Sequence, residues 1–123
     1  MFTIYFYVLI SITGWLSKVY DSKDVTDPFV DVRLGKAKLV KSTIIQNNLN
    51  PVWNESYKID VCHYGDQLLF EIRDKDHAMT EYIGSVEIDT MKLIHGEIFS
   101  GKYPILKRNK KPNGTLNIYV EFR

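Results

Sequence analysis

Short runs in which apolar and polar residues alternate follow one another along the chain, each bounded by glycine, proline, asparagine or aspartate. Because successive side chains of a β-strand point to opposite faces, a two-residue alternation puts the apolar side chains on one face. β-branched and aromatic residues, which favour strands, dominate these runs. The pattern predicts eight strands, at residues 2–13, 29–34, 37–44, 54–60, 67–73, 82–88, 102–106 and 114–122. A short helix is expected at residues 90–95, where Gly96 ends it.

Closely spaced strands with one short helix are typical of an all-β antiparallel sandwich and argue against a parallel α/β sheet. Gly35 and Lys36 separate two of the strands and predict a hairpin turn. The first and last strands are expected to lie side by side. Because no repeat or linker composition interrupts the pattern, we expect a single domain over residues 1–123.

The opening run, residues 1–16, is the most apolar part of the chain and raises the alternative of a targeting segment. It lacks a basic region before its apolar core and a small-residue cleavage site after it. It is also short for a membrane-spanning helix, which needs roughly eighteen or more apolar residues. Tyrosine, phenylalanine, valine, isoleucine and threonine dominate the run, so a central strand is the preferred interpretation.

Composition and charge narrow the function classes. The net charge of +1 gives no general attraction to nucleic acid or to an acidic partner, so any charge argument must be local. The single cysteine, Cys62, cannot form an internal disulfide and fits a reducing, cytoplasmic location. The histidines and Cys62 lack the spacing of a zinc site, and no G-x-S-x-G motif is present. We therefore do not expect the chain to be an enzyme in its own right.

Acidic residues are concentrated in two of the connections between predicted strands. They are Asp21, Asp24 and Asp27 before the second strand, and Asp74, Asp76 and Glu81 after the fifth. A calcium ion takes roughly six to eight oxygen ligands from a flexible cage, and two connections at one end of a sandwich could supply it. Asn47 could add an amide oxygen. Taken one at a time, each of these acids is better explained as a solvated turn former; it is their grouping in two connections that indicates calcium.

An EF-hand is not predicted, because no glycine stands at the sixth position counted from any of these aspartates. Three segments instead resemble the signature stretches of C2 domains: VTDPFVDV, NNLNPVWNESYKI and LLFEIRDKDHAMTEYIG. The resemblance covers nearly the whole chain, and the three motifs stand in the family's order. It implies an eight-stranded antiparallel β-sandwich of type II topology with calcium-binding loops at one end.

The loop pattern is similar to that of the C2 domain of cytosolic phospholipase A2. That resemblance implies calcium ligands at Asp24, Asp27, Asn47, Asp74 and Asp76, with the backbone carbonyls of Val25 and Lys75. More general members of the family imply the set Asp21, Asp27, Asp74, Asp76 and Glu81. The sequence contains both sets, and the choice between them stays open.

The resemblance also implies calcium-dependent binding to phospholipid membranes, with anionic lipids favoured. The loop tips expected to face the bilayer are Val19, Tyr20, His77, Ala78 and Met79. Lys36, Lys38 and Lys58 are candidates for a basic sheet face that binds a phosphoinositide headgroup, although such lysines are more often solvated strand positions.

Three other functions remain open at this stage. The chain could be a calcium-independent C2 adaptor that binds proteins. It could be the regulatory domain of a larger lipid-modifying enzyme. It could belong to a pore-forming protein, in which case a secreted location would replace the cytoplasmic one.

Overall fold

The computed structural model describes residues 2–13, 27–45, 52–61, 67–75, 80–94 and 96–122. Within these ranges it contains eight strands and one short helix. They are β1 (Phe2–Thr13), β2 (Pro28–Leu34), β3 (Ala37–Lys41), β4 (Val52–Val61), β5 (Gln67–Lys75), β6 (Thr80–Asp89), α1 (Thr90–Ile94), β7 (Phe99–Leu106) and β8 (Pro112–Phe122). The predicted strands and helix are all present, with ends that differ by a few residues.

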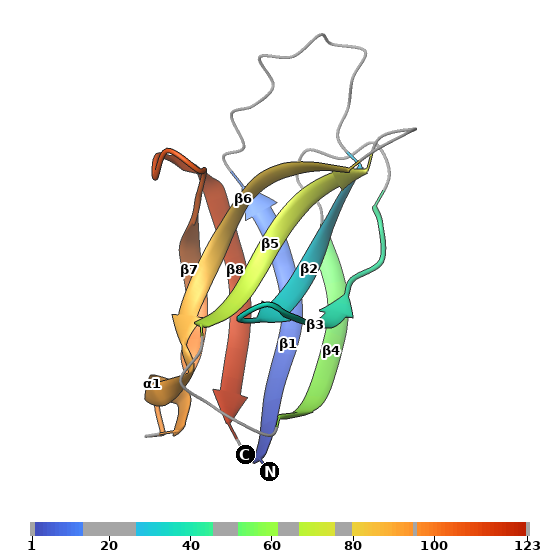
Figure 1. The fold of residues 1–123 in the computed structure, drawn as a ribbon. Coiled ribbons are helices and arrows are strands. Elements are labelled where there is room, and N and C mark those ends of the chain that lie inside the picture. Colours follow the sequence, from blue (N-terminus) through green and yellow to red (C-terminus); the bar gives the residue numbers. More distant parts are fainter. Residues whose placement is uncertain are drawn as a thin grey trace, which may run out of the picture.

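The strands are antiparallel and follow the order β3-β2-β5-β6-β7-β8-β1-β4. A single residue pair, Ser85 with Leu106, joins β6 to β7. The sheet therefore folds over at this point into two layers, β3-β2-β5-β6 and β7-β8-β1-β4 (Figure 1). β1 pairs with β8, which confirms that the first and last strands lie side by side. The all-β sandwich of type II topology is thus confirmed.

The core lies between the two layers, and buried apolar side chains of β2, β4, β5, β6, β7 and β8 point into it. One layer contributes Val30, Val32, Leu34, Leu68, Phe70, Ile72, Ile83, Val86 and Ile88, and the other contributes Trp53, Ile105, Leu116, Ile118 and Val120. Burying each such side chain stabilises the fold by about 1.5–3 kcal/mol relative to leaving it in water. Leu93 of α1 closes the end of the core opposite to the start of β2.

The third strand ends earlier than its pattern predicts, at Lys41 and not at residue 44. Ser42 explains the difference, because its Oγ accepts the hydrogen bond that the Val30 N–H donates, at 2.8 Å. The backbone of the following residues is then free to leave the ladder. It turns toward Pro28, whose carbonyl accepts a hydrogen bond from the Ile45 N–H at 3.1 Å.

β6 and β7 approach each other closely where the sheet folds over. A Cβ added at Gly84 would lie 2.6 Å from Cγ2 of Ile105 and 2.9 Å from the Leu106 carbonyl oxygen. These distances are shorter than any normal contact, so the approach needs a residue without a side chain. Gly84 therefore sets how closely the two layers meet.

Candidate functional site

Asp27 and Asp74 come from the two acidic connections and lie together at one end of the sandwich. The Asp27 N–H donates to Oδ1 of Asp74 at 2.9 Å, and the Lys75 N–H donates to the Asp27 carbonyl oxygen at 2.9 Å. Asp27 and Asp74 are neighbours because β2 pairs with β5, and in that pairing Pro28 at the start of β2 faces Asp74 near the end of β5. The backbone of Asp27 thus lies against the carboxylate of Asp74, and two residues with side chains of the kind that calcium prefers are neighbours although they are distant in the chain.

Glu81 lies on the next strand. It faces Asp74 across the β5–β6 ladder, and its side chain is exposed, as is that of Lys75. Three acidic residues therefore lie at this end, Asp27 directly before β2, Asp74 on β5 and Glu81 on β6. Within the described ranges, however, no three histidine, cysteine, aspartate or glutamate side chains are close enough together to hold one metal ion.

Ten further candidate residues lie outside the described part of the chain: Val19, Tyr20, Asp21, Asp24, Val25, Asn47, Asp76, His77, Ala78 and Met79. They belong to the connections β1–β2, β3–β4 and β5–β6. β1 and β5 end, and β2, β4 and β6 begin, at the end of the sandwich where Asp27 and Asp74 lie (Figure 1). β3 ends farther away, but the segment after it reaches this end, where the Ile45 N–H bonds to the Pro28 carbonyl.

The three candidate lysines are distributed over both layers. Lys36 lies in the exposed turn between β2 and β3, at the end of β2 farthest from Asp27. Lys38 lies on β3, opposite Arg33 of β2, whereas Lys58 lies on β4. β3 and β4 occupy the two ends of the strand order and belong to different layers. The structure therefore does not bring Lys58 together with Lys38 on one sheet face.

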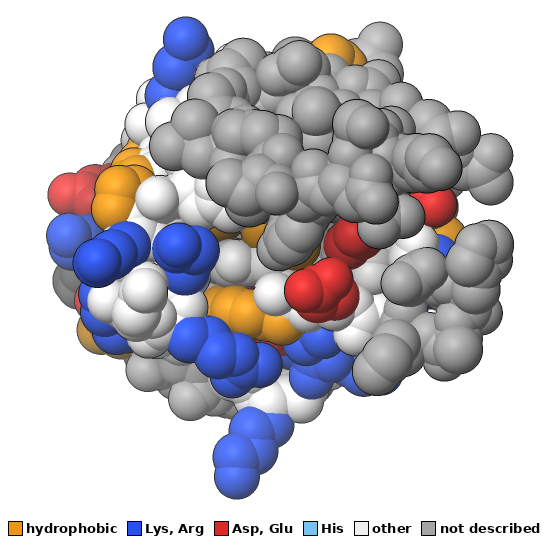
Figure 2. Space-filling model, turned by 90° about the horizontal axis from the view of Figure 1, so that it is seen from above, with side chains coloured by type: hydrophobic (Ala, Val, Ile, Leu, Met, Phe, Trp, Pro, Cys, Tyr) orange, Lys and Arg blue, Asp and Glu red, His pale blue; other side chains and the backbone are white. Residues whose placement is uncertain are grey.

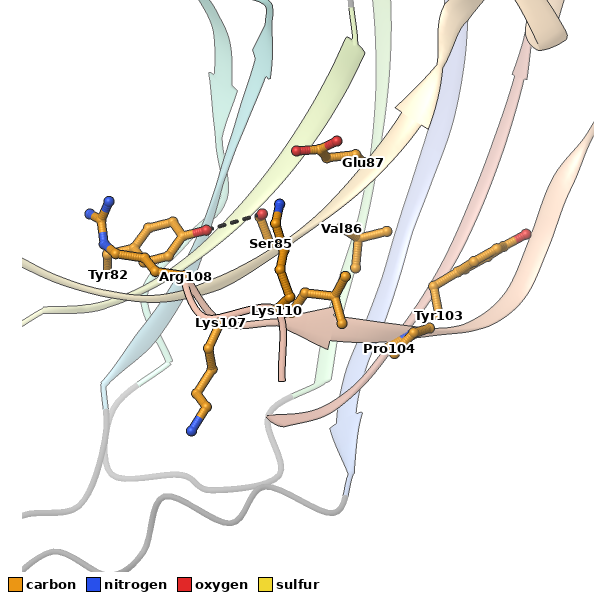
Figure 3. A pocket seen from close by; sticks show the side chains of 10 residues that line it. Tyr82, Ser85, Val86, Glu87, Tyr103, Pro104, Lys107, Arg108 and Lys110 are labelled. Atoms are coloured by element: carbon orange, nitrogen blue, oxygen red, sulfur yellow. Dashed lines mark hydrogen bonds between the residues drawn. The ribbon is translucent and has the colours of Figure 1, made fainter. Parts of the chain in front are cut away.

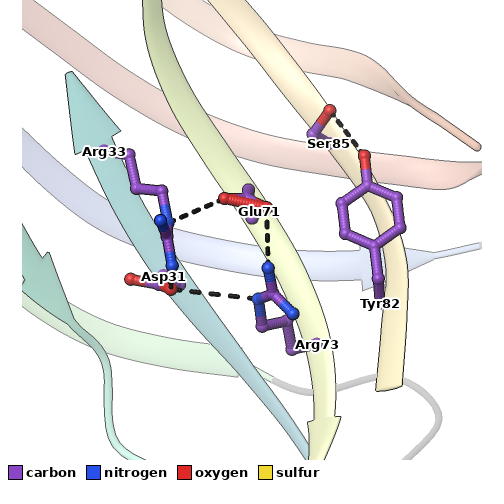
Figure 4. Close-up of polar contacts among 6 residues, drawn as sticks. All are labelled: Asp31, Arg33, Glu71, Arg73, Tyr82 and Ser85. Atoms are coloured by element: carbon purple, nitrogen blue, oxygen red, sulfur yellow. Dashed lines mark hydrogen bonds and ion pairs between the residues drawn. The ribbon is translucent and has the colours of Figure 1, made fainter. Parts of the chain in front are cut away.

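A network of four charged side chains covers the outer face of β2 and β5 (Figure 4). Arg33 contacts Asp31 at 3.0 Å and Glu71 at 2.8 Å, and Arg73 contacts Glu71 at 3.0 Å and Asp31 at 3.8 Å. The sequence carries a signal for this network. In D-x-R and E-x-R the two charges are two residues apart, so each pair lies on one face of its strand.

A shallow hollow of about 400 Å³ opens beside this network, and it is lined in part by Lys38, Lys41 and Arg73. The ammonium of Lys41 lies 4.6 Å from the centre of the Phe29 ring, a cation–π contact. Because the acids of the network offset its two arginines, the surplus positive charge on this face comes from the lysines of β3.

Glu55 anchors the segment that follows β3. Its carboxylate accepts hydrogen bonds from the Thr43 N–H at 3.3 Å and from the hydroxyls of Thr43 and Tyr57. Burial alone would raise the pKa of Glu55, but these donors stabilise the anion and the net effect is a lowered pKa. Burial, together with the bond to the Glu55 anion, raises the pKa of Tyr57 far above its usual range.

Trp53 completes this anchor. Its indole Nε1 donates to the Thr43 carbonyl oxygen at 2.8 Å, while its ring is fully buried in the core. The segment that leads into the β3–β4 connection is therefore fixed to β4 by the side chains of Trp53 and Glu55, and to β2 by its backbone.

The family model of the C2 domain matches residues 7–105, which is most of the chain. The chain belongs to the C2 domain family. Phospholipase D gamma 3 of Arabidopsis thaliana is 35% identical over 91 residues, which are 74% of this chain and 10% of that protein. The chain thus spans about a tenth of the length of such relatives.

Solved C2 structures share the fold of this domain. The calcium-bound structure of the two C2 domains of extended synaptotagmin 2 superposes with a TM-score of 0.76 at 24% identity, covering 98% of this chain and 45% of that one. Human GIVD cytosolic phospholipase A2 gives a TM-score of 0.74 at 18% identity, covering 98% of this chain and 17% of that one. Among the described residues, no helix is long and apolar enough to cross a membrane.

Proposed function

We propose that this C2 domain binds phospholipid membranes when calcium fills the end of the sandwich where Asp27 and Asp74 meet. The observation that carries the proposal is the hydrogen bond between these two residues. It joins the start of β2 to the end of β5, and six acids lie in or beside the β1–β2 and β5–β6 connections that adjoin these strand ends. Calcium-bound C2 domains of extended synaptotagmin 2, which share the fold, support the assignment.

The residues present are suited to calcium. Carboxylate, amide and carbonyl oxygens on loops form the flexible cage that this hard cation prefers. Asp27 and Asp74 belong to both ligand sets that the sequence implies. Asp24, Asn47 and Asp76, with the carbonyls of Val25 and Lys75, would complete one set, and Asp21, Asp76 and Glu81 would complete the other.

Bound calcium would act as an electrostatic switch. Without metal, the acids repel one another and repel anionic headgroups. Two ions would reduce their summed charge from about −6 to about −2, and Lys18, Lys23, Arg73 and Lys75 would then make this end positive. Association of this acidic part with anionic lipid becomes favourable only in that state. Val19, Tyr20, His77, Ala78 and Met79 would contact the bilayer at the loop tips.

Lys36, in the turn before β3, and Lys38, on β3, are proposed to assist by attracting a phosphoinositide headgroup. Lys58 would act separately, on the other layer. In this proposal residues 1–123 form a single domain that performs no reaction itself, works at the cytoplasmic side of membranes, and can target a larger lipid enzyme.

Vesicle co-sedimentation with calcium or with chelator tests the proposal. Binding to vesicles of phosphatidylcholine and phosphatidylserine should require calcium and should be weaker with phosphatidylcholine alone. Equal binding with calcium and with chelator would contradict the switch. A melting temperature that millimolar calcium leaves unchanged would contradict the metal site and favour a calcium-independent adaptor.

A further inference from the structure

A hollow of about 390 Å³ lies where β6 meets the end of β7 and the turn that follows it (Figure 3). Polar lining residues come from both sides of this junction: Tyr82, Ser85 and Glu87 of β6, and Lys107, Arg108 and Lys110 of the turn. The lining contains three cations and one carboxylate, so it carries a net positive charge. A negatively charged group is the ligand that such a hollow would attract.

The cations belong to an ordered turn, residues 107–111, which we name the basic turn. The Lys107 N–H donates to the Lys111 carbonyl at 2.9 Å, and the Lys110 N–H donates to the Lys107 carbonyl at 2.8 Å. The Lys111 N–H donates to Oδ1 of Asn109 at 3.0 Å. All five residues are exposed, and in the described part of the chain none of the four cations forms an ion pair.

Arg108 is held in place by an aromatic ring. The central carbon of its guanidinium lies 4.4 Å from the centre of the Tyr82 ring, and that of Arg73 lies 5.7 Å from the same centre. The Tyr82 hydroxyl donates to Oγ of Ser85 at 3.0 Å. A stacked guanidinium keeps its N–H groups for an anion and has less side-chain freedom to lose on binding.

Lys110 occupies a position that its backbone does not favour. Its φ of 68° lies in the left-handed region, which is costly for any residue with a Cβ. A positive side chain is thus present at a site where glycine or asparagine would be easier to accommodate. The lysine at this unfavourable backbone position is a second, independent indication that the positive charge of the turn is functional.

The basic turn lies at the same end of the sandwich as Asp27 and Asp74. β7 ends and β8 begins there, and Thr115 of β8 faces Thr13, the last residue of β1. Figure 2 looks onto this end and shows several lysine and arginine side chains on its left and lower parts, with acidic side chains near the centre, on the right and at the left edge. An extended anionic surface that covered this end would meet the basic turn and the acidic connections together.

We propose that the hollow beside the basic turn binds the phosphate of an anionic phospholipid, as a membrane contact that does not need calcium. This inference rests on the proposed function, because it assumes that this end of the domain faces the bilayer. A membrane is favoured over an acidic peptide because the four cations project from an exposed hairpin tip and do not line a groove along the sheet.

The test compares two double variants that each remove two positive charges. Arg108→Gln with Lys110→Asn alters the basic turn, and asparagine tolerates the left-handed backbone at position 110. Lys92→Gln with Lys102→Gln is the matched control, since Lys92 lies on α1 at the opposite end and Lys102 is an exposed residue of β7. Calcium affinity, measured without lipid from the melting temperature, should be the same for both variants and the wild type.

Vesicles of phosphatidylcholine and phosphatidylserine are the probe, with calcium and with chelator. Each cation at an anionic surface is worth about fivefold in affinity, equivalent to about 1 kcal/mol. The basic-turn variant should therefore bind roughly 25-fold more weakly than the wild type with calcium, and the control less than about twofold more weakly. With chelator at low salt, the wild type should keep weak binding that the basic-turn variant loses.

The outcomes separate this inference from the proposed function. Calcium-dependent binding that is equal in both double variants would overturn the basic-turn site and leave the calcium switch standing. Wild-type binding that is equally strong with calcium and with chelator, and that only the basic-turn variant loses, would overturn the switch and support the site. Absence of wild-type binding to every vesicle would overturn both.

Discussion

Asp74 is the residue on which the calcium site depends most directly, because its carboxylate already holds the backbone of Asp27. Asp74→Asn keeps an oxygen that can accept this hydrogen bond but removes the charge that attracts calcium. We expect the apo fold to remain intact and the calcium-dependent rise in melting temperature to disappear. For the wild type, a calcium concentration about 100 times Kd should add about 2.7 kcal/mol to the free energy of unfolding.

Asp89→Asn is the matched control for this prediction. Asp89 lies at the other end of β6, where its Oδ1 accepts a hydrogen bond from the Met91 N–H at 3.0 Å, and asparagine can do the same. This variant should respond to calcium as the wild type does. A calcium response that survives in both Asp27→Asn and Asp74→Asn would mean that the site lies elsewhere. Glu81→Gln then distinguishes the two ligand sets, since only one of them contains Glu81.

Glu55 makes the stability of the fold depend on pH. The pKa of Glu55 is lower in the folded state than in the unfolded state. Its carboxylate therefore stabilises the fold at pH values above the unfolded-state pKa, and this stabilisation is lost as the pH falls through the folded-state pKa. Glu55→Gln should therefore lower the melting temperature at neutral pH and reduce its decline in acid. Melting curves across the acid range check this. Glu97→Gln, at an exposed position, should keep the wild-type slope.

At the scale of elements, the close approach of β6 to β7 is the most sensitive feature. Gly84→Ala places a methyl group against Ile105 and the Leu106 carbonyl, so the layers must separate locally. Overpacking of this kind costs about 1–3 kcal/mol, which chemical denaturation would measure. Ser56→Ala, at an exposed position of β4, should change the free energy of unfolding by less than about 0.5 kcal/mol. Equal effects of the two changes would show that the contact is not tight.

The sequence predicts these elements well because each strand carries its own alternation of apolar and polar residues. Its errors are local and have physical causes. The end of β3 depends on a side-chain hydrogen bond at Ser42, which periodicity does not report. The joining of β6 to β7 depends on one glycine whose neighbour, Ile105, is distant in the chain.

The candidate site could be predicted only in part, for a similar reason. The concentration of acidic residues in two connections is visible in the sequence. In the fold, the pairing of β2 with β5 makes Asp27 and Asp74 neighbours, which a shared site at one end of the sandwich requires. The basic turn is equally visible as K-R-N-K-K, but a run of charge between strands usually indicates only a solvated turn. The stacking of its arginine on Tyr82, which belongs to a different strand, required the fold.

At the scale of the whole molecule, membrane binding should depend on charge more than on insertion. Raising salt from about 0.05 to 0.5 M shortens the Debye length from about 14 to about 4 Å, and binding to anionic vesicles should weaken steeply. Met79→Ala should cost no more than about 1–2 kcal/mol, because its lost methylenes allow no more. Salt-insensitive binding to phosphatidylcholine vesicles would instead indicate that apolar insertion dominates.

The hollow beside the basic turn spans the line along which the sandwich folds over, since β6 belongs to one layer and β7 to the other. Only the pair Ser85–Leu106 joins the two strands in the described part of the chain, so this seam is where the layers are expected to part first. A headgroup held between Ser85 and the basic turn would link the two layers and oppose their separation. Vesicles should then slow amide hydrogen exchange in β6 and β7 more than in β4, and the membrane would become part of what keeps the domain closed.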